Sequence, residues 1–233
     1  HPGLGQHRGV EGGRVAVGTL TPPRALVFEP DGTLAATLGG EGEGPGEFSR
    51  VRSVVSLGDD SVAVWDPSRR RMSVFTEDGA FAREVDLSDL APLSAAAVPN
   101  TRMNAGFVHL LPGGSGSLVL FGEGLFSSDD DPGVRRPELP TRRITTEGDE
   151  LASLGPFPGI EMVVGSPLGL RPFGARTYAT TVGDALVVGT AESTQFRVFG
   201  PGGELERIVR WPDHDRSVGG PFLSTWSAMV DSA

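Results

Sequence analysis

Two short acidic segments are the densest groups of side chains in this chain that could hold a metal ion. They are Asp129-Asp130-Asp131 and Asp213-His214-Asp215. A helical calcium loop needs a glycine and a terminal glutamate at set positions, and the first segment lacks both. Zinc sites need several nitrogen or sulfur ligands, and the second segment has one histidine without another at ligand spacing. Both segments are therefore interpreted as surface loops.

The motifs contain no recognisable nucleophile and no phosphate-binding loop. Gly114-Ser115-Gly116-Ser117 does not match the G-x-S-x-G pattern of serine hydrolases. The glycine-rich segment Gly39–Gly46 has Glu41 and Glu43 in place of a lysine, and these carboxylates would repel a phosphate. We therefore predict no catalytic or cofactor-binding residue from motifs, and we interpret Gly39–Gly46 as a linker.

Arg69-Arg70-Arg71 is the most basic run of the sequence. If it lay on a strand, Arg69 and Arg71 would face one side and Arg70 the other. The run has no flanking aromatic residues on which bases could stack. The chain carries a net charge of −10, whereas nucleic-acid binding depends on lysine and arginine contacts to phosphates. We interpret the run as a solvated turn with ion-pair partners, and we expect no nucleic-acid partner.

The composition indicates an all-β protein. The 233 residues include 34 glycines and 19 prolines without a collagen period, so the chain has many turns and many short strands. No apolar run approaches the roughly 18 residues of a transmembrane helix, so none is expected. The absence of cysteine from the sequence excludes disulfides and thiolate metal sites.

An internal repeat is the strongest signal in the sequence. Four segments share an apolar pair, a turn with aspartate or glycine, and an apolar return, which is typical of a β-hairpin. They are Val27–Leu34, Val74–Phe81, Ile144–Leu151 and Val198–Leu205. Their turns, counted at residues 32, 79, 149 and 203, lie 47, 70 and 54 residues apart. Such self-similarity indicates a repeat architecture.

A second apolar run precedes the turn by the same 17 residues in three of the four copies. These runs begin at Val15, Val62 and Leu186, ahead of Gly32, Gly79 and Gly203. In the remaining copy the equivalent run, Leu118–Phe121, lies further from its turn, which is explained by an insertion at 122–140. Further strands are expected upstream at Val51–Leu57, Gly106–Leu111 and Thr177–Val182.

The repeat predicts a β-propeller of four-stranded antiparallel blades, as a single domain over residues 1–233. One such sheet cannot bury both faces, so it must stack on its neighbours. About four blades are expected, ending near residues 38, 87, 155 and 210, with a further blade beginning at 221–233. Aromatic residues are expected to pack between blades: Phe28, Phe75, Phe199, Trp65 and Trp211. The alternative is a β-sandwich with coincidentally similar turns.

Part of the repeat resembles a known family. The linker Gly39–Phe48, the strand Val62–Asp66 and the segment Arg71–Gly79 resemble an NHL-type repeat. More closely, they are similar to bacterial six-bladed propellers of the NHL/TolB-like kind. The similarity covers about residues 12–87 and the unit that ends near Arg210, and it is poor across 88–175. Because that family has six blades, the resemblance implies a fragment or an incomplete ring.

The resemblance implies a non-catalytic binding or scaffold propeller that recognises a protein, peptide or small-molecule ligand on one face of the disc. It also implies an extracytoplasmic location, whether periplasmic, secreted or surface-anchored. We expect a monomer. The alternative is a metal-dependent lactonase, hydrolase or lyase with a divalent metal in the central channel. Its donors near the axis would come from Asn100, Asn104, His109 and Glu161.

Strand alternation and position identify a set of residues at the loops and strand ends where propellers bind their ligands. The predicted ligand-facing residues are Arg52, Asp66, Arg69, Asn104, His109, Arg176 and Tyr178.

Overall fold

The secondary-structure elements found among the described residues are all β-strands. The computed structural model describes residues 4–9, 13–58, 60–90, 103–104, 109–122, 125–126, 132–164, 169–171 and 174–213, and side chains within 4–9, 103–104, 109, 125–126 and 169–170 are not described. Among these residues no helix is long and apolar enough to span a membrane.

Four antiparallel sheets of four strands each follow one another along the chain, and we call them blades 1 to 4. Blade 1 contains β1 (Leu4–Gly9), β2 (Val15–Leu20), β3 (Pro23–Phe28) and β4 (Leu34–Leu38). Blade 2 contains β7 (Ser53–Gly58), β8 (Ser61–Asp66), β9 (Arg71–Thr76) and β10 (Phe81–Asp86). Blade 3 contains β12 (His109–Pro112), β13 (Ser117–Phe121), β16 (Glu138–Thr145) and β17 (Glu150–Pro158). Blade 4 contains β20 (Tyr178–Val182), β21 (Ala185–Gly189), β22 (Gln195–Phe199) and β23 (Leu205–Arg210).

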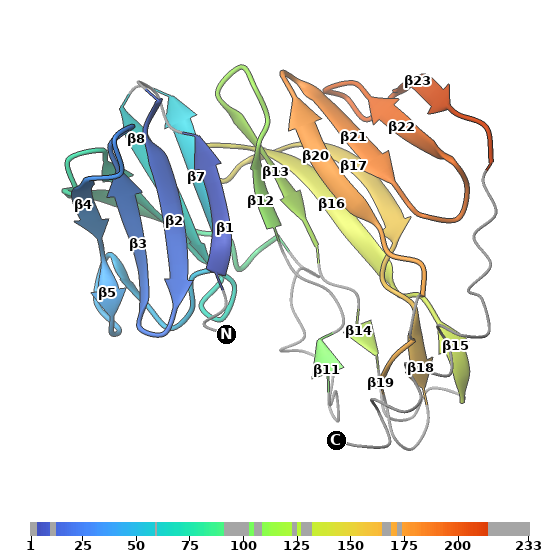
Figure 1. Ribbon diagram of the computed structural model, residues 1–233, viewed down its shortest axis with the longest axis horizontal. Helices are drawn as coiled ribbons and strands as arrows, with labels where there is room; N and C mark the ends of the chain where they lie inside the picture. Colours follow the sequence, from blue (N-terminus) through green and yellow to red (C-terminus); the bar gives the residue numbers. More distant parts are fainter. Residues whose placement is uncertain are drawn as a thin grey trace.

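The blades are arranged radially, with the first strand of each blade innermost. Strand β7 contacts both β1 and β12, and β12 also contacts β20. Figure 1 shows the four sheets succeeding one another from blue to red, each turned relative to the one before. The prediction of an all-β propeller with four-stranded blades is therefore confirmed, and the sandwich alternative is wrong.

The four hairpin turns between the third and fourth strands of the blades have the same geometry. In each, a glycine with positive φ donates its N–H to the carbonyl of the residue three positions earlier. The glycines are Gly32 (φ 86°), Gly79 (φ 100°), Gly148 (φ 99°) and Gly203 (φ 89°). The sequence placed the third turn at Asp149, but Gly148 occupies the equivalent position because only glycine adopts such φ values without strain.

Alternating residues of each sheet build a separate apolar core at each junction between blades. Val62 and Val64 of β8 pack toward blade 1, beside Val27. Ala63 and Trp65 of the same strand point to the other face and pack toward blade 3. A third core joins blades 3 and 4. Blade 2 is thus buried on both faces, which explains the nearly continuous apolar run of β8.

Arginine side chains also cross the first two junctions. Nη1 of Arg14 in blade 1 lies 2.9 Å from a carboxylate oxygen of Glu77 in blade 2. Nη1 of Arg83 in blade 2 donates to the carbonyl of Thr146 in blade 3, at 2.8 Å. These two contacts join neighbouring blades, and they help to fix the orientation of blade 1 on blade 2 and of blade 2 on blade 3.

In the part of the chain that the structure describes, three small sheets supplement the blades. They are the parallel pair β5 (Gly40–Glu41) and β6 (Glu47–Phe48), the pair β11 (Met103–Asn104) and β14 (Leu125–Phe126), and a three-stranded sheet. The last contains β15 (Gly133–Arg135), β18 (Met162–Val164) and β19 (Gly169–Leu170). Figure 1 shows the β11–β14 pair and the three-stranded sheet at the lower edge, where β16 begins. We call this end of the blades, at which β7, β12, β16 and β20 start, the linker face.

Candidate functional site

The predicted ligand-facing residues are distributed along the linker face. In blade 2, Arg52 directly precedes β7, Asp66 ends β8, and Arg69 lies in the turn between β8 and β9. In blade 4, Arg176 precedes β20 and Tyr178 is its first residue. His109 is the first residue of β12, and Asn104 lies in β11. The side chains of Asn104 and His109 lie outside the described residues.

Asp66 has a structural role in the turn of blade 2. The residue is only 2% exposed. Its carboxylate accepts N–H groups from both sides: Ser49 and Arg50 of the linker at 2.8 and 3.1 Å, and Ser68 and Arg69 of the turn at 2.9 and 3.3 Å. A carboxylate with four backbone donors is well compensated for its burial. Asp66 therefore joins the linker to blade 2 through backbone hydrogen bonds.

The arginine run beside Asp66 is engaged in contacts within the protein. Nε of Arg69 donates to Oγ of Ser49 at 2.8 Å, and Nη1 of Arg71 forms an ion pair with Glu84 at 2.8 Å. Arg70 has a positive φ of 54° within the turn. Arg69 and Arg70 lie in the turn between β8 and β9, as the interpretation of a turn expects, and Arg71 is the first residue of β9. The ion-pair partners expected for the run are present for Arg69 and Arg71, since Arg69 also lies 3.9 Å from Asp66.

Arg176 and Tyr178 lie on blade 4, whereas Arg52, Asp66 and Arg69 lie on blade 2 with blade 3 between them. The linker face thus contains two groups of predicted residues and not one. Both Arg176 and Tyr178 are exposed. Trp211, expected in the core, is also exposed. It lies just beyond β23, where its ring contacts that of the partly buried Phe196 with centroids 5.8 Å apart and its backbone N–H donates to the Thr194 carbonyl at 3.1 Å.

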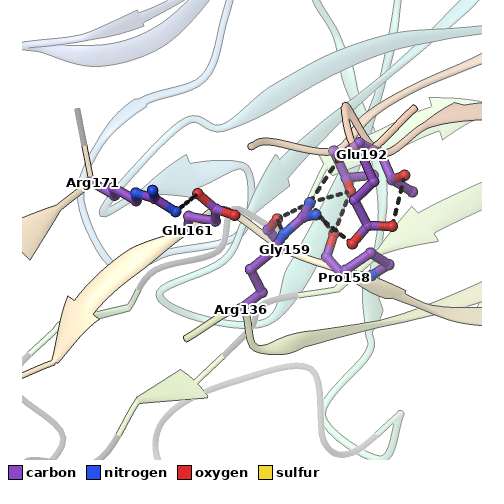
Figure 2. A network of polar contacts seen from close by, with 8 residues as sticks. Arg136, Pro158, Gly159, Glu161, Arg171 and Glu192 are labelled. Carbon is purple, nitrogen blue, oxygen red and sulfur yellow. Dashed lines mark hydrogen bonds and ion pairs between the residues drawn. The ribbon is translucent and has the colours of Figure 1, made fainter. Parts of the chain in front are cut away.

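Arg136 joins the small sheet of β15, β18 and β19 to blade 4 (Figure 2). The residue lies between β15 and β16, and its side chain is only 12% exposed. Its guanidinium donates to the Gly159 carbonyl at 2.7 and 2.9 Å and to the Thr190 carbonyl at 3.0 Å. It also forms an ion pair with Glu192 at 2.7 Å. All three nitrogens are bonded, so this arginine is a rigid support.

Glu161, a predicted metal donor, is paired with an arginine. Its carboxylate lies 3.0 Å from Nη1 of Arg171, as Figure 2 shows, and its N–H donates to the Ala175 carbonyl at 2.9 Å. The described part of the chain contains no group of three or more histidine, aspartate or glutamate residues that could hold a metal ion. The donors Asn100, Asn104 and His109 lie outside the described side chains, as do the segments Asp129–Asp131 and His214-Asp215.

Three exposed arginines surround the small sheet. Arg135 ends β15 and is paired in register with Met162 of β18. Arg171 follows β19, and its side chain is 50% exposed. The hydrogen bond from the Glu161 N–H to the Ala175 carbonyl brings Arg176 to the same end of the small sheet. Sequence reasoning identified only Arg176, because the three residues come from distant segments and no spacing links them. For Arg135 the only signal in the sequence was the insertion at 122–140, in which this residue lies.

A buried arginine at the blade 3–4 junction was also missed. Arg143 of β16 is 3% exposed, and its Nη1 donates to the Gly113 carbonyl at 2.6 Å and to Oγ of Ser117 at 2.8 Å. Its Nη2 bonds the Asp184 carbonyl of blade 4. Burial lowers the pKa of this guanidinium below its usual value, against the opposing effect of Asp184. Since Arg143 of blade 3 bonds the Asp184 carbonyl of blade 4, its role is to hold these two blades together.

No protein-family model and no curated protein sequence matches the chain. Solved structures do match it. A Bacteroides fragilis protein, named as a candidate exported protein, superposes with a TM-score of 0.50 at 16% identity, over 86% of this chain and 48% of that one. Virginiamycin B lyase from Staphylococcus aureus gives 0.45 at 14% identity, over 91% and 71%. The N-terminal domain of Nup159 gives 0.48 at 11% identity, over 92% and 55%.

These similarities concern the fold. At 16% identity, the superposition on the Bacteroides fragilis protein shows a shared fold and nothing about the chemistry of this chain. The chain spans about half the length of the Bacteroides fragilis protein.

Proposed function

We propose that the chain is a non-catalytic binding propeller that recognises an acidic peptide, protein segment or small carboxylate ligand on the linker face, over blades 3 and 4. The observation that carries this proposal is the group of exposed arginines, Arg135, Arg171 and Arg176, around the small sheet. Arginine presents a planar fork of donors that matches a carboxylate.

The support beneath these arginines is rigid, which favours binding. Arg136 bonds the carbonyls of Gly159 and Thr190 and pairs with Glu192 (Figure 2). The small sheet is therefore attached to blade 4 and cannot move independently without breaking these bonds. A surface that is already ordered loses less conformational entropy on binding its ligand. Loops and additional elements on a rigid scaffold are also where binding residues concentrate.

The local charge contrasts with that of the whole chain. Aspartate and glutamate number 30 against 20 lysines and arginines. An arginine group in a chain with a net charge of −10 gives an anionic ligand a local site of favourable charge.

We also propose that the blades are of the NHL/TolB-like kind and that the protein acts outside the cytoplasm. The turn and linker around Asp66 support the first point. The name of the Bacteroides fragilis protein, with which the chain shares its fold, is consistent with the second.

A binding measurement tests the function. Glutamate-rich peptides and matched glutamine-rich peptides are immobilised, and binding of the chain is measured at low and high salt. The chain should bind the glutamate series selectively, with affinity that falls as salt rises. The triple variant Arg135→Ala, Arg171→Ala, Arg176→Ala should lose at least about tenfold in affinity, since each charge-assisted hydrogen bond contributes about 1.5–3 kcal/mol.

Arg197→Ala serves as the matched control, because Arg197 is an exposed arginine of β22 in blade 4. It should bind like the unmodified chain. Equal affinity of the triple variant and the control, or no preference for glutamate over glutamine, would contradict the proposal.

A further inference from the structure

Two arginines beside the small sheet differ in how firmly their guanidinium groups are held (Figure 2). The side chain of Arg136 is 12% exposed and donates to backbone carbonyls as well as to Glu192. The side chain of Arg171 is 50% exposed, and its Nη1 lies 3.0 Å from a carboxylate oxygen of Glu161. An exposed ion pair contributes little stability, because water and salt screen it. The pair of Arg171 and Glu161 can therefore open at small cost to the fold.

Strand alternation places Glu161 on the outer face of the small sheet. Met162 and Val164 of β18 are 0% and 4% exposed, and they form a core with the partly buried Ile160. Because side chains alternate along a strand, Glu161 and Val163 point to the opposite face, where Val163 is 38% exposed. The Glu161 carboxylate thus lies on the face of the sheet that solvent reaches.

The register of β18 and β19 holds Arg171 opposite Glu161. Met162 of β18 pairs with Leu170 of β19. The adjacent pair is Glu161 with Arg171, whose N–H donates to the Glu161 carbonyl at 3.1 Å. Opposite charges at directly opposed positions of a sheet attract each other. The backbone therefore keeps the two side chains within reach of each other even when their ion pair is open.

We propose that Glu161 is a specificity-determining residue that competes with the acidic ligand for Arg171. The inference rests on the proposed function, in which Arg135, Arg171 and Arg176 bind carboxylates of the ligand. In the free protein the Glu161 carboxylate accepts a hydrogen bond from Arg171, and a carboxylate of the ligand displaces it on binding.

This competition specifies the class of ligand. A carboxylate that replaces Glu161 forms one charge-assisted hydrogen bond to Arg171 and breaks another of the same kind, so the exchange gains little. The displaced carboxylate also stays nearby and repels the incoming one. Net affinity must then come from further carboxylates at Arg135 and Arg176. The favoured ligand is therefore a peptide or protein segment with several carboxylates, and a ligand with a single carboxylate is disfavoured.

Peptide binding, measured by fluorescence anisotropy at physiological salt, tests the inference. The labelled peptides carry either three glutamates or one glutamate in the same glutamine background, and the unmodified chain should prefer the first. Glu161→Gln removes the competing charge and keeps an amide oxygen that can accept from Arg171. It should raise the affinity for the three-glutamate peptide by about two- to fivefold, the range that exposed ion pairs reach.

Glu150→Gln is the matched control for the change in net charge. Glu150 of β17 pairs with Arg142 of β16 at 2.6 Å, so its substitution also removes one carboxylate from an arginine ion pair, here on blade 3. This variant should bind the peptide like the unmodified chain.

A double-mutant cycle shows whether Glu161 acts through Arg171. The substitution Glu161→Gln is repeated in the Arg171→Ala background, where no guanidinium is left to compete for. It should bring no gain in affinity there. All variants should keep the circular dichroism of a folded β-protein.

Several results would overturn the inference. Unchanged or weaker binding by Glu161→Gln would mean that Glu161 orients Arg171 or has no part in binding. An equal gain with and without Arg171, or the same gain from Glu150→Gln, would mean that overall charge sets the affinity. Equal affinity of the unmodified chain for the two peptides would refute the class of ligand.

Failure of the proposed function gives a different result. The triple variant Arg135→Ala, Arg171→Ala, Arg176→Ala would then bind like Arg197→Ala, and the inference about Glu161 would fail with it. If the triple variant loses affinity as expected while Glu161→Gln brings no gain, the inference alone is refuted.

Discussion

Blade 2 and blade 4 contain the same four-stranded unit in different surroundings. Met72 in β9 and Phe196 in β22 occupy equivalent positions, yet Met72 is fully buried and Phe196 is not. The difference arises because blade 3 covers the face of blade 2 on which Met72 lies, whereas no described sheet covers the corresponding face of blade 4. Burial in this fold is thus a property of the junction and not of the blade, as expected for a repeat stabilised by nearest-neighbour contacts.

The comparison implies that stability is concentrated in the middle of the array. Blade 2 contributes to two apolar cores, and blades 1 and 4 contribute to one each. Substitutions at equivalent positions should therefore have unequal effects, depending on the junction in which they lie.

The largest effect is expected at the blade 1–2 junction. Phe75 is 2% exposed and packs on Phe48 and Phe81, with ring centroids 6.0 and 5.7 Å away. Phe75→Ala should lower the free energy of unfolding by about 3–5 kcal/mol, as for other buried aromatic truncations. Urea unfolding followed by circular dichroism measures the change.

The matched control is Phe28→Ala, the substitution at the equivalent position of blade 1, where the side chain has intermediate exposure. It should cost less than half as much, because solvent already reaches Phe28. Equal losses, or a loss below about 1 kcal/mol for Phe75→Ala, would mean that Phe75 does not lie between blades.

A smaller effect is expected from the linker of blade 2. Asp66→Ala leaves the N–H groups of Ser49, Arg50, Ser68 and Arg69 without their acceptor, so about 2–3 kcal/mol of stability should be lost. Thermal unfolding measures this loss. Asp31→Ala, which removes the acceptor for a single N–H in an exposed turn, should cost clearly less, and the reverse order would refute the structural role of Asp66.

The next effect is local to blade 4. Arg136→Ala should destabilise the protein by about 1–2 kcal/mol, because several backbone carbonyls lose their donor. Hydrogen exchange should accelerate in β18 and β21 and stay unchanged in β8. Arg135→Ala, which removes an exposed neighbour, should alter neither stability nor exchange. Uniform acceleration across all blades would argue against a local role for Arg136.

The smallest effect concerns acid. The Thr33 N–H lowers the pKa of Asp31, and the Thr76 hydroxyl and Ala80 N–H lower that of Asp78. Depressed carboxyl pKa values contribute stability that is present above the ordinary pKa of about 4 and is lost as pH falls through the folded values. In blade 4 the position equivalent to Asp31 and Asp78 is Gly202, so that turn has no carboxylate to titrate. The double variant Asp31→Asn, Asp78→Asn should therefore show a smaller fall in melting temperature between neutral and acidic pH, and an unchanged fall would contradict this assignment.

The repeat was predictable because its turns need glycine at fixed positions. Gly32, Gly79 and Gly203, together with the apolar runs 17 residues earlier, located three of the four blades. The innermost strand of blade 1, β1, was not predicted, since its sequence Leu4–Gly9 lacks the alternation of the others.

The candidate site was less predictable than the fold. Asp66 has the chemistry of a binding residue, and only the structure shows that its carboxylate is saturated by backbone donors. Arg135 and Arg171 come together through pairings among β15, β18 and β19, and these strands of two or three residues carry almost no sequence signal. Contacts between distant segments, and not local patterns, determine which arginines stay exposed on this face.

The stacking of successive sheets can be tested directly with a disulfide, because the chain has no native cysteine. A Cβ atom at Gly18 of β2 would lie 3.8 Å from Cβ of Val51, which precedes β7, and disulfides span about 3.5–4.5 Å between Cβ atoms. Gly189 occupies the position of Gly18 in blade 4. The double variant Gly18→Cys, Val51→Cys should form an intramolecular disulfide rapidly on mild oxidation, seen by mass spectrometry, and Gly189→Cys, Val51→Cys should not. Failure of the first pair to crosslink in the folded protein, or equal crosslinking of both pairs, would contradict the radial stacking of the blades.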